Sequence, residues 1–224
     1  MCVSKNVPQK RFDYADAWVS LLPNVLPDTS PKLTDQQKLD DFYAQKVGPP
    51  TVGLLDFMVC RKEEMSLVRK ARSIGNPKER DYFIRRSLSA IVVPVKVNSR
   101  DFTMADDRLV KEYNGLILLE FPAGQDSVGL RRLLKTLPWV WCVTLSADAE
   151  NILAIVPLDN KDYREHKRFS DALRREFEER GFHIQERCGN LTVLMFKTYD
   201  ADAWINGYCT LYRLPEKCEC ENVW

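Results

Sequence analysis

The sequence predicts an α+β protein, and three features lead to that class. Four runs of strand length occur in the second half, each continuously apolar or rich in aromatic and β-branched residues. Two segments in which apolar residues recur every three or four positions separate the first run from the second and the third from the fourth. The order over residues 115–206 is therefore β-α-β-β-α-β, the ferredoxin-like or RRM-like arrangement. A charged, helix-forming stretch precedes this core, so we also expect an N-terminal helical extension.

The elements of the core follow in chain order. The predicted strands are NGLILLEFP (114–122), WVWCVTLS (139–146), ILAIVPL (152–158) and LTVLMFKT (191–198). The predicted helices are DSVGLRRLLKTL (126–137) and KDYREHKRFSDALRREFEERGF (161–182). In the second helix Phe169, Leu173 and Phe177 share one stripe, which should face the sheet.

The chain divides at Gly48-Pro49-Pro50, which marks the best domain boundary. Residues 1–50 are predicted to be an irregular N-terminal arm packed on the core, with one short helix at 34–46. Residues 51–206 form the predicted α+β domain, and residues 207–224 form a C-terminal tail.

Within that domain, residues 51–90 are predicted to be helical, with a break at Gly75-Asn76-Pro77. The following IVVPVKV (91–97) is predicted to be an edge strand, because Pro94 cannot donate a ladder hydrogen bond.

Composition limits the function only weakly. The formal charge of the 224 residues is +1, so any electrostatic attraction to nucleic acid must be local. We see neither an N-terminal targeting segment nor a run that could cross a membrane, and we expect a cytoplasmic protein without a membrane partner. The seven cysteines are odd in number and scattered, which favours reduced thiols. Cys209, Cys218 and Cys220 are too few for a structural zinc site, and we expect no metal and no cofactor.

Residues 61–86 carry a local excess of positive charge, with nine basic residues against four acidic ones. Basic helices beside a sheet can contact phosphates without sequence preference. The alternative is a solvated helix face whose charges pair with one another. The candidate nucleic-acid contacts are Arg69, Lys70, Arg72, Arg85 and Arg86, together with His166 of the second core helix. For His166 the alternative is a partly buried packing role.

Glu120, at the end of the first core strand, is the one acid of the core that suggests a metal ligand. Cations in phosphoryl transfer are usually held by two or more carboxylates. Pro122 cannot ligate through its side chain, whereas Asp148 and Glu150 of a nearby loop could approach Glu120 unless they are solvated turn residues. The sequence contains no phosphate-binding P-loop, no dinucleotide-binding glycine motif and no hydrolase motif.

Several segments resemble, in order and spacing, the VirE N-terminal-domain family of bacterial mobile elements. They are VRKARSI, KERDYFIRRSLSAI, NGLILLEFP, LSADAENILAIVPL, GFHIQER and NLTVLMFKTYDADAWIN, within residues 52–206. That family is similar to archaeo-eukaryotic primase–polymerases, whose core is RRM-like. The resemblance therefore implies a primase-like scaffold.

The family's catalytic positions carry other residue types in this chain. The resemblance places the family's Asp-x-Asp at Glu120 and Pro122, its later acid at Gln185, and its Ser-x-Ser-Gly-x-Gly turn at residues 146–151, where both glycines are replaced. Two-metal nucleotidyl transfer needs clustered carboxylates, and added Cβ atoms obstruct the approach of a phosphate. We therefore predict a vestigial site, with no catalytic residue, at Glu120, Pro122, Asp148, Glu150 and Gln185.

Other positions keep the family's pattern. Tyr199-Asp200 and Trp204-Ile205-Asn206 match it, although a structural role would also explain them. Arg72, Arg85 and His166 match its basic or histidine positions, while Val193 replaces an expected arginine.

Three functional hypotheses follow. The leading one is a non-catalytic, primase-like protein of a mobile element that binds nucleic acid or a replication or mobilisation protein. The second is an interaction module that uses the fold as a platform and exposes Trp139, Trp141, Trp204 or Trp224. The third is a metal-dependent nucleotidyl-transfer enzyme with a site rearranged around Glu120, Asp148 and Glu150.

Overall fold

The computed structural model describes residues 10–15, 17–22 and 48–215, and in them it confirms an α+β protein built on antiparallel sheets. The strands are β1 (Trp18–Leu22), β2 (Thr51–Gly53), β3 (Ala90–Val92), β4 (Val95–Val97), β5 (Val110–Tyr113), β6 (Leu116–Phe121), β7 (Cys142–Leu145), β8 (Ile152–Pro157), β9 (Leu194–Phe196) and β10 (Trp204–Ile205). The helices are α2 (Leu54–Met58), α3 (Lys62–Ser73), α4 (Pro77–Ser87), α5 (Asp106–Leu109), α6 (Ser127–Thr136) and α7 (His166–Glu178), with 3₁₀ turns η1 (Tyr163–Glu165) and η2 (Glu186–Gly189). The helix expected at 34–46 lies outside the described residues.

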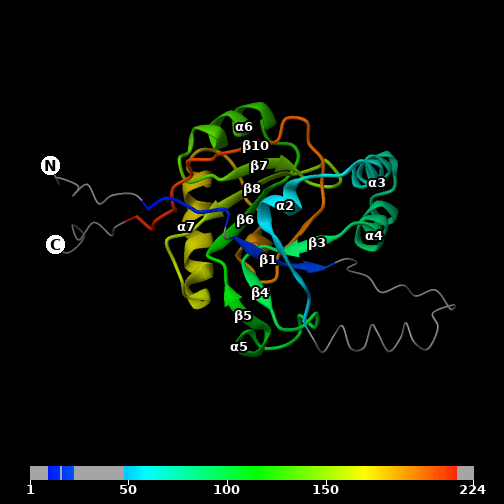
Figure 1. Ribbon diagram of the computed structural model, residues 1–224. Helices are drawn as coiled ribbons and strands as arrows, with labels where there is room; N and C mark the ends of the chain where they lie inside the picture. Colours follow the sequence, from blue (N-terminus) through cyan, green and yellow to red (C-terminus); the bar gives the residue numbers. More distant parts are fainter. Residues whose placement is uncertain (1–9, 16, 23–47, 216–224) are drawn as a thin grey trace, which may run out of the picture.

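Two four-stranded sheets and a pair of helices form the layers of the molecule (Figure 1). The first sheet has the order β10-β7-β8-β6, and the second has the order β2-β1-β3-β9. Helices α6 and α7 cover one face of the first sheet, and the second sheet covers its other face. A two-stranded β4-β5 sheet completes the structure at one end.

The alternation of β6 explains why both of its faces are buried. Ile117, Leu119 and Phe121 join the cluster that includes α6 and α7, while Leu116 and Leu118 join the cluster shared with the second sheet. Because side chains alternate along a strand, Glu120 points to the same face as Leu116 and Leu118. The acid is therefore directed into the layer between the two sheets.

The last predicted core strand pairs differently from the ferredoxin-like order. Strand β9 runs antiparallel to β3, with Ile91 opposite Met195, and so belongs to the second sheet. Beside β6 the chain places residues 185–188 instead: the amide of Gln185 donates to the Glu120 carbonyl at 2.9 Å, and the amide of Glu120 donates to Cys188 Sγ at 3.2 Å. The thiol satisfies the amide that a neighbouring strand would have bonded, so strand pairing stops there.

Two other expectations about the first half are wrong. Within the arm predicted to be irregular, residues 18–22 form β1, which pairs with β2 on one side and β3 on the other. The strand expected at 91–97 is broken at Pro94 into β3 and β4, and β3 is an internal strand rather than an edge. The proline ends the strand instead of placing it at an edge.

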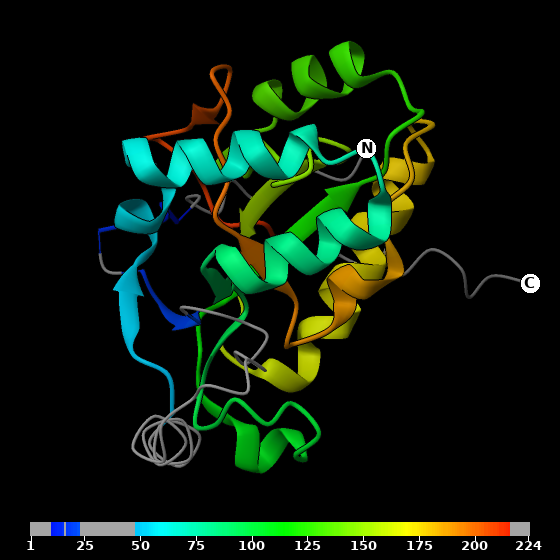
Figure 2. The ribbon, with the colours of Figure 1, turned by 90° about the vertical axis from the view of Figure 1, so that its right-hand side faces the viewer.

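Helices α3 and α4 lie side by side across the open end of the two sheets (Figure 2). Val68 and Ala71 of α3 pack with Ile84 of α4 and with Ala147 of the β7–β8 loop. The break predicted between the helices is confirmed, since Asn76 caps α4 by accepting from the Lys78 amide at 2.9 Å. Among the described residues, no helix combines the length and the apolar character needed to cross a lipid bilayer.

Candidate functional site

A cavity of about 250 Å³ lies where the two sheets meet under α4. Its wall includes Glu120 of β6, Asp148 of the β7–β8 loop, Asp81 and Arg85 of α4, and Arg187 of η2. Apolar side chains from β9 and α4 complete the wall. The cavity therefore collects three acids and two bases at the end of the sheet–sheet interface.

Both carboxylate oxygens of Glu120 accept hydrogen bonds from one arginine, Arg187. The Nε of Arg187 donates to Oε2 at 2.7 Å, and its Nη2 donates to Oε1. The Glu120 side chain is 4% exposed, whereas that of Arg187 is 55% exposed. Hydrogen bonding to Glu120 raises the pKa of the Arg187 guanidinium. This fork geometry uses both carboxylate oxygens, the atoms that a metal ion would need.

The structure brings part of the predicted vestigial site together. Gln185 lies beside Glu120 through its main chain, and its side-chain amide donates to Asn151 Oδ1 at 3.5 Å. Asp148 reaches the cavity but accepts from the Ser146 hydroxyl and from the Glu150 amide, so it also closes its own loop. Of the five predicted positions only Glu120 and Asp148 line the cavity; Gln185, Pro122 and Glu150 do not.

Glu150 lies outside because it pairs with Arg80 of α4. The Pro122 carbonyl accepts from the side chain of Gln125 at 3.2 Å. These two predicted positions therefore do not share a pocket with Glu120.

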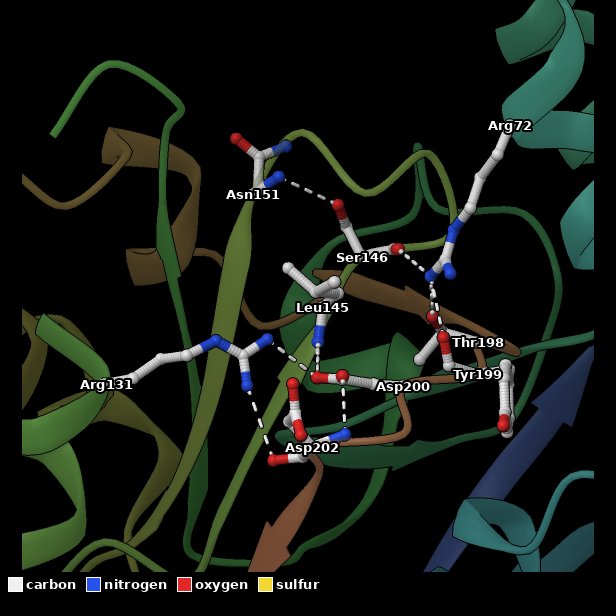
Figure 3. A network of polar contacts seen from close by, with 9 residues as sticks. All are labelled: Arg72, Arg131, Leu145, Ser146, Asn151, Thr198, Tyr199, Asp200 and Asp202. Atoms are coloured by element: carbon white, nitrogen blue, oxygen red, sulfur yellow. Dashed lines mark hydrogen bonds and ion pairs between the residues drawn. The ribbon is translucent and has the colours of Figure 1, made fainter. Parts of the chain in front are cut away.

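The β7–β8 loop is held by a half-buried arginine (Figure 3). Arg72 donates to the carbonyls of Ala147, Ser146 and Tyr199 at 3.2, 3.1 and 2.7 Å, and to the Thr198 hydroxyl at 3.3 Å. Burial lowers the pKa of this guanidinium. Arg72 therefore joins the loop to residues 198–199, and its donors are used within the protein rather than for a phosphate.

Two of the residues singled out in the sequence after the last predicted strand, Asp200 and Asn206, hold the chain after β9. Asp200 accepts from Arg131 of α6 at 2.7 Å and from the Leu145 amide at 3.0 Å (Figure 3). The amide of Asn206 donates to the Trp141 carbonyl at 2.7 Å. These contacts give Asp200 and Asn206 structural roles.

His166 lies in the interior, apart from the basic helices. Its Nδ1 is 3.0 Å from the Tyr113 hydroxyl, and its side chain is 1% exposed. Burial lowers the pKa of His166 to about 4, against the opposing effect of the Cys188 main chain. The packing alternative is therefore correct for this histidine, because its ring cannot reach a surface ligand.

The remaining candidate nucleic-acid contacts on α3 and α4 differ in how strongly their side chains are held by contacts within the protein. Arg85 pairs with Asp81 at 2.8 Å and lies over the Phe196 ring. Arg69 lies over the Tyr199 ring and Lys70 over the Phe83 ring, yet both side chains are exposed. Arg86 is exposed as well and donates to the Tyr82 hydroxyl at 3.3 Å.

We call the exposed cations of these two helices and the residue before α3 the α3–α4 basic surface. It consists of Arg61, Lys62, Arg69, Lys70, Lys78 and Arg86. Of the nine basic residues counted in this segment, the other three, Arg72, Arg80 and Arg85, are drawn into contacts that leave them only partly exposed. The same helices also expose Glu63, Glu79 and Asp81, so the exposed charges of the segment are six positive against three negative.

Sequence reasoning did not single out Arg187 and Arg131, the arginines that bind Glu120 and Asp200. Each is distant along the chain from its partner, so neither pair produces a local spacing signal. Within the described ranges, no three histidine, cysteine, aspartate or glutamate side chains are grouped as a metal site would require. The chain matches no protein-family model, no curated protein and no solved structure.

The tryptophans expected on an interaction surface are placed differently from one another. Trp141 is 0% exposed and lies against Phe12 and Tyr14. Trp139 packs on Phe177 and Tyr212, and Trp224 is outside the described residues. Trp204 differs from these, since it lines a surface groove.

Proposed function

We propose that this chain is a non-catalytic, primase-like protein of a mobile element that binds nucleic acid through its phosphates. The observation that carries the proposal is the α3–α4 basic surface, where six cations are exposed. Phosphate contacts by lysine and arginine supply most of the affinity in sequence-independent binding. The whole chain has a formal charge of only +1, so this local excess stands out against the rest of the molecule.

The arrangement around β8 supports the primase-like, RRM-like part of the proposal. Strands β6 and β7 both pair antiparallel with β8, so they are parallel to each other across it. The α6 crossover joins them, which is the split βαβ unit of such cores. The departure is β9, which has moved to the second sheet.

The state of the acids supports the non-catalytic part. Two-metal phosphoryl transfer needs carboxylate oxygens that face the cations. Glu120 has both oxygens on Arg187, Glu150 pairs with Arg80, and Asp148 closes its own loop. Each acid of the rearranged-site hypothesis therefore already has a partner.

The proposal is tested by fluorescence anisotropy with labelled single-stranded and double-stranded oligonucleotides over a salt series. The wild type should bind at low salt, and its affinity should fall steeply as salt rises. The variant R69E/K70E should weaken binding, and K111E/K161E is the matched control, because both of those lysines are exposed and lie away from α3 and α4.

If the wild type binds neither the single-stranded nor the double-stranded oligonucleotide at low salt, the proposal is refuted. Equal weakening by both double variants would also count against it, since net charge alone would then explain the effect. Calorimetry with a nucleoside triphosphate and Mg²⁺ tests the enzyme alternative, which saturable binding would favour.

A further inference from the structure

A second surface feature lies on the opposite side of residues 198–202 from α3. It is a groove of about 530 Å³ between α6 and the start of β10. Helix α6 contributes Val128, Arg131, Arg132 and Lys135, and the other wall includes Trp204. The helix itself contains no acidic residue, so its cations are not balanced along the helix.

The cations of this α6–β10 groove differ in whether they form an ion pair within the protein. Arg131 is committed to Asp200 at 2.7 Å and to the Asp202 carbonyl at 3.4 Å (Figure 3). Arg132 and Lys135 are exposed, and within the described part of the chain they form no ion pair. Residues three apart on a helix are neighbours on its surface. Two adjacent cations are therefore presented to any ligand in the groove.

The opposite wall consists of Trp204, Ala203 and the exposed Asp202, so the groove presents two cations and one acid beside an aromatic ring. The Trp204 indole is partly exposed, and its inner part packs against the core behind α6. Val128 of α6 is 67% exposed, although valine is usually buried. A ligand that fits this groove would stack a planar apolar group on the Trp204 indole and place a negative charge next to Arg132 and Lys135. A nucleotide of a single strand has both, because its base is unpaired and its phosphate is adjacent.

The groove and the α3–α4 basic surface each contribute an arginine to the segment at residues 199–200. Arg69 of that surface lies over the Tyr199 ring, with its guanidinium carbon 5.7 Å from the ring centre. The next residue, Asp200, is held by Arg131 of the groove. Arg72, which like Arg69 belongs to α3, donates to the Tyr199 carbonyl at 2.7 Å (Figure 3). The two cationic regions thus meet across one firmly held segment.

We infer that the α6–β10 groove is a binding site for single-stranded nucleic acid, in which a base stacks on Trp204 and adjacent phosphates contact Arg132 and Lys135. The inference rests on the proposed function and adds the form of the ligand and the residues that select it. A duplex keeps its bases stacked inside, so it can use the α3–α4 basic surface but not the indole. Single strands therefore bind more tightly than duplexes of equal length.

Anisotropy with a labelled oligothymidine strand tests the groove directly. The variant R132E/K135E should lower affinity by about tenfold or more, and should reduce the slope of log K against log salt by about 0.7 for each phosphate that the groove no longer neutralises. K111E/K161E has the same change in charge and should leave both quantities near the wild-type values.

The stacking part is tested with a strand of the same length that lacks bases. The wild type should bind this abasic strand about fivefold or more weakly than oligothymidine. W204L should bind the two strands alike, while W204F should retain part of the difference. Circular dichroism and thermal unfolding verify that these variants fold, and the comparison of the two strands on the wild type needs no variant.

The outcomes separate the groove from the proposed function. If R132E/K135E binds like wild type while R69E/K70E is weakened, the groove inference is overturned and the proposed function stands. If the wild type binds no strand, both are overturned. If the groove variant abolishes binding of a labelled polyglutamate peptide that the wild type binds more tightly than oligothymidine, the groove is a site for acidic protein segments and the inference is also overturned.

Discussion

Replacing Arg187 by methionine should destabilise the protein far more than replacing its partner Glu120 by glutamine. The reason is the unequal exposure of the pair, since the Glu120 side chain is 4% exposed and that of Arg187 is 55% exposed. In R187M the carboxylate stays buried and loses the group that neutralises it. In E120Q the guanidinium remains in water, and the glutamine carbonyl can still accept one of its hydrogen bonds.

The magnitudes follow from this difference. Removing one partner of a buried ion pair costs about 3 to 5 kcal/mol when the remaining charge stays buried. Loss of a hydrogen bond without a buried charge costs about 1 kcal/mol. We therefore expect R187M to lose about 2 to 4 kcal/mol more unfolding free energy than E120Q. The double variant E120L/R187M should recover much of the loss, because apolar replacement of a buried pair is often nearly neutral.

Urea unfolding at neutral pH, with linear extrapolation, measures these differences. R168M is the matched arginine control: Arg168 pairs with Glu165 at 3.0 Å, but the two side chains are 61% and 46% exposed. That substitution should cost less than about 1 kcal/mol. Equal losses for R187M and E120Q, or an R187M loss as small as that of R168M, would refute the reasoning.

Three further predictions use other parts of the fold. Ala149 has φ of 62°, a left-handed conformation that glycine adopts without strain, so A149G should raise the free energy of unfolding by about 1 kcal/mol in urea titrations. Lys197 is 7% exposed and donates to the carbonyls of Phe57 and Val59 at 2.7 and 2.8 Å, so K197M should cost about 3 kcal/mol and speed hydrogen exchange in α2. His166 has a pKa lowered by burial from 6.5 to about 4. Stability should therefore fall as the pH falls through that window, by about 1.4 kcal/mol per unit, because the unfolded chain binds a proton that the folded chain excludes.

Controls make these outcomes decisive. H166F should remove the loss of unfolding free energy between pH 6.5 and about 4. H183Q, which replaces an exposed histidine, should still show that loss. K167M removes an exposed lysine and should leave stability nearly unchanged. A destabilised A149G, or a K197M variant as stable as K167M, would contradict the corresponding argument.

The local elements of the core could be predicted because their signals are local. The apolar runs at β6 and β8 and the helical spacing of α6 and α7 depend on residues within a few positions of one another. The same reasoning was wrong for β1, because one short apolar stretch among prolines resembles an irregular arm until a sheet provides neighbours on both sides. It was also wrong for β3, where Pro94 ends the strand rather than placing it at an edge.

The candidate site was less accessible to prediction. The position of Asp148 in the strand-to-strand loop suggested that it could approach Glu120, and the resemblance added Gln185; the structure places Glu120 and Asp148 at one cavity and bonds the Gln185 amide to the Glu120 carbonyl. Their partners could not be inferred, because ion pairs such as Glu120 with Arg187 join residues far apart in the chain. The same limit applies to Arg72 and His166, which resemble surface contacts in the sequence but are used inside the fold.

The sequence by itself therefore determined the α+β class, the elements β6, α6, β7, β8, α7 and β9, and the excess of cations between residues 61 and 86, whereas β10 was not predicted. Tertiary structure alone decided which sheet receives β9, which arginine neutralises Glu120, and which cations remain exposed. The physical reason is that periodicity records only whether a side chain is apolar and how often it recurs. The partner of a main-chain edge or of a buried charge is chosen by whatever segment packing brings within hydrogen-bonding distance.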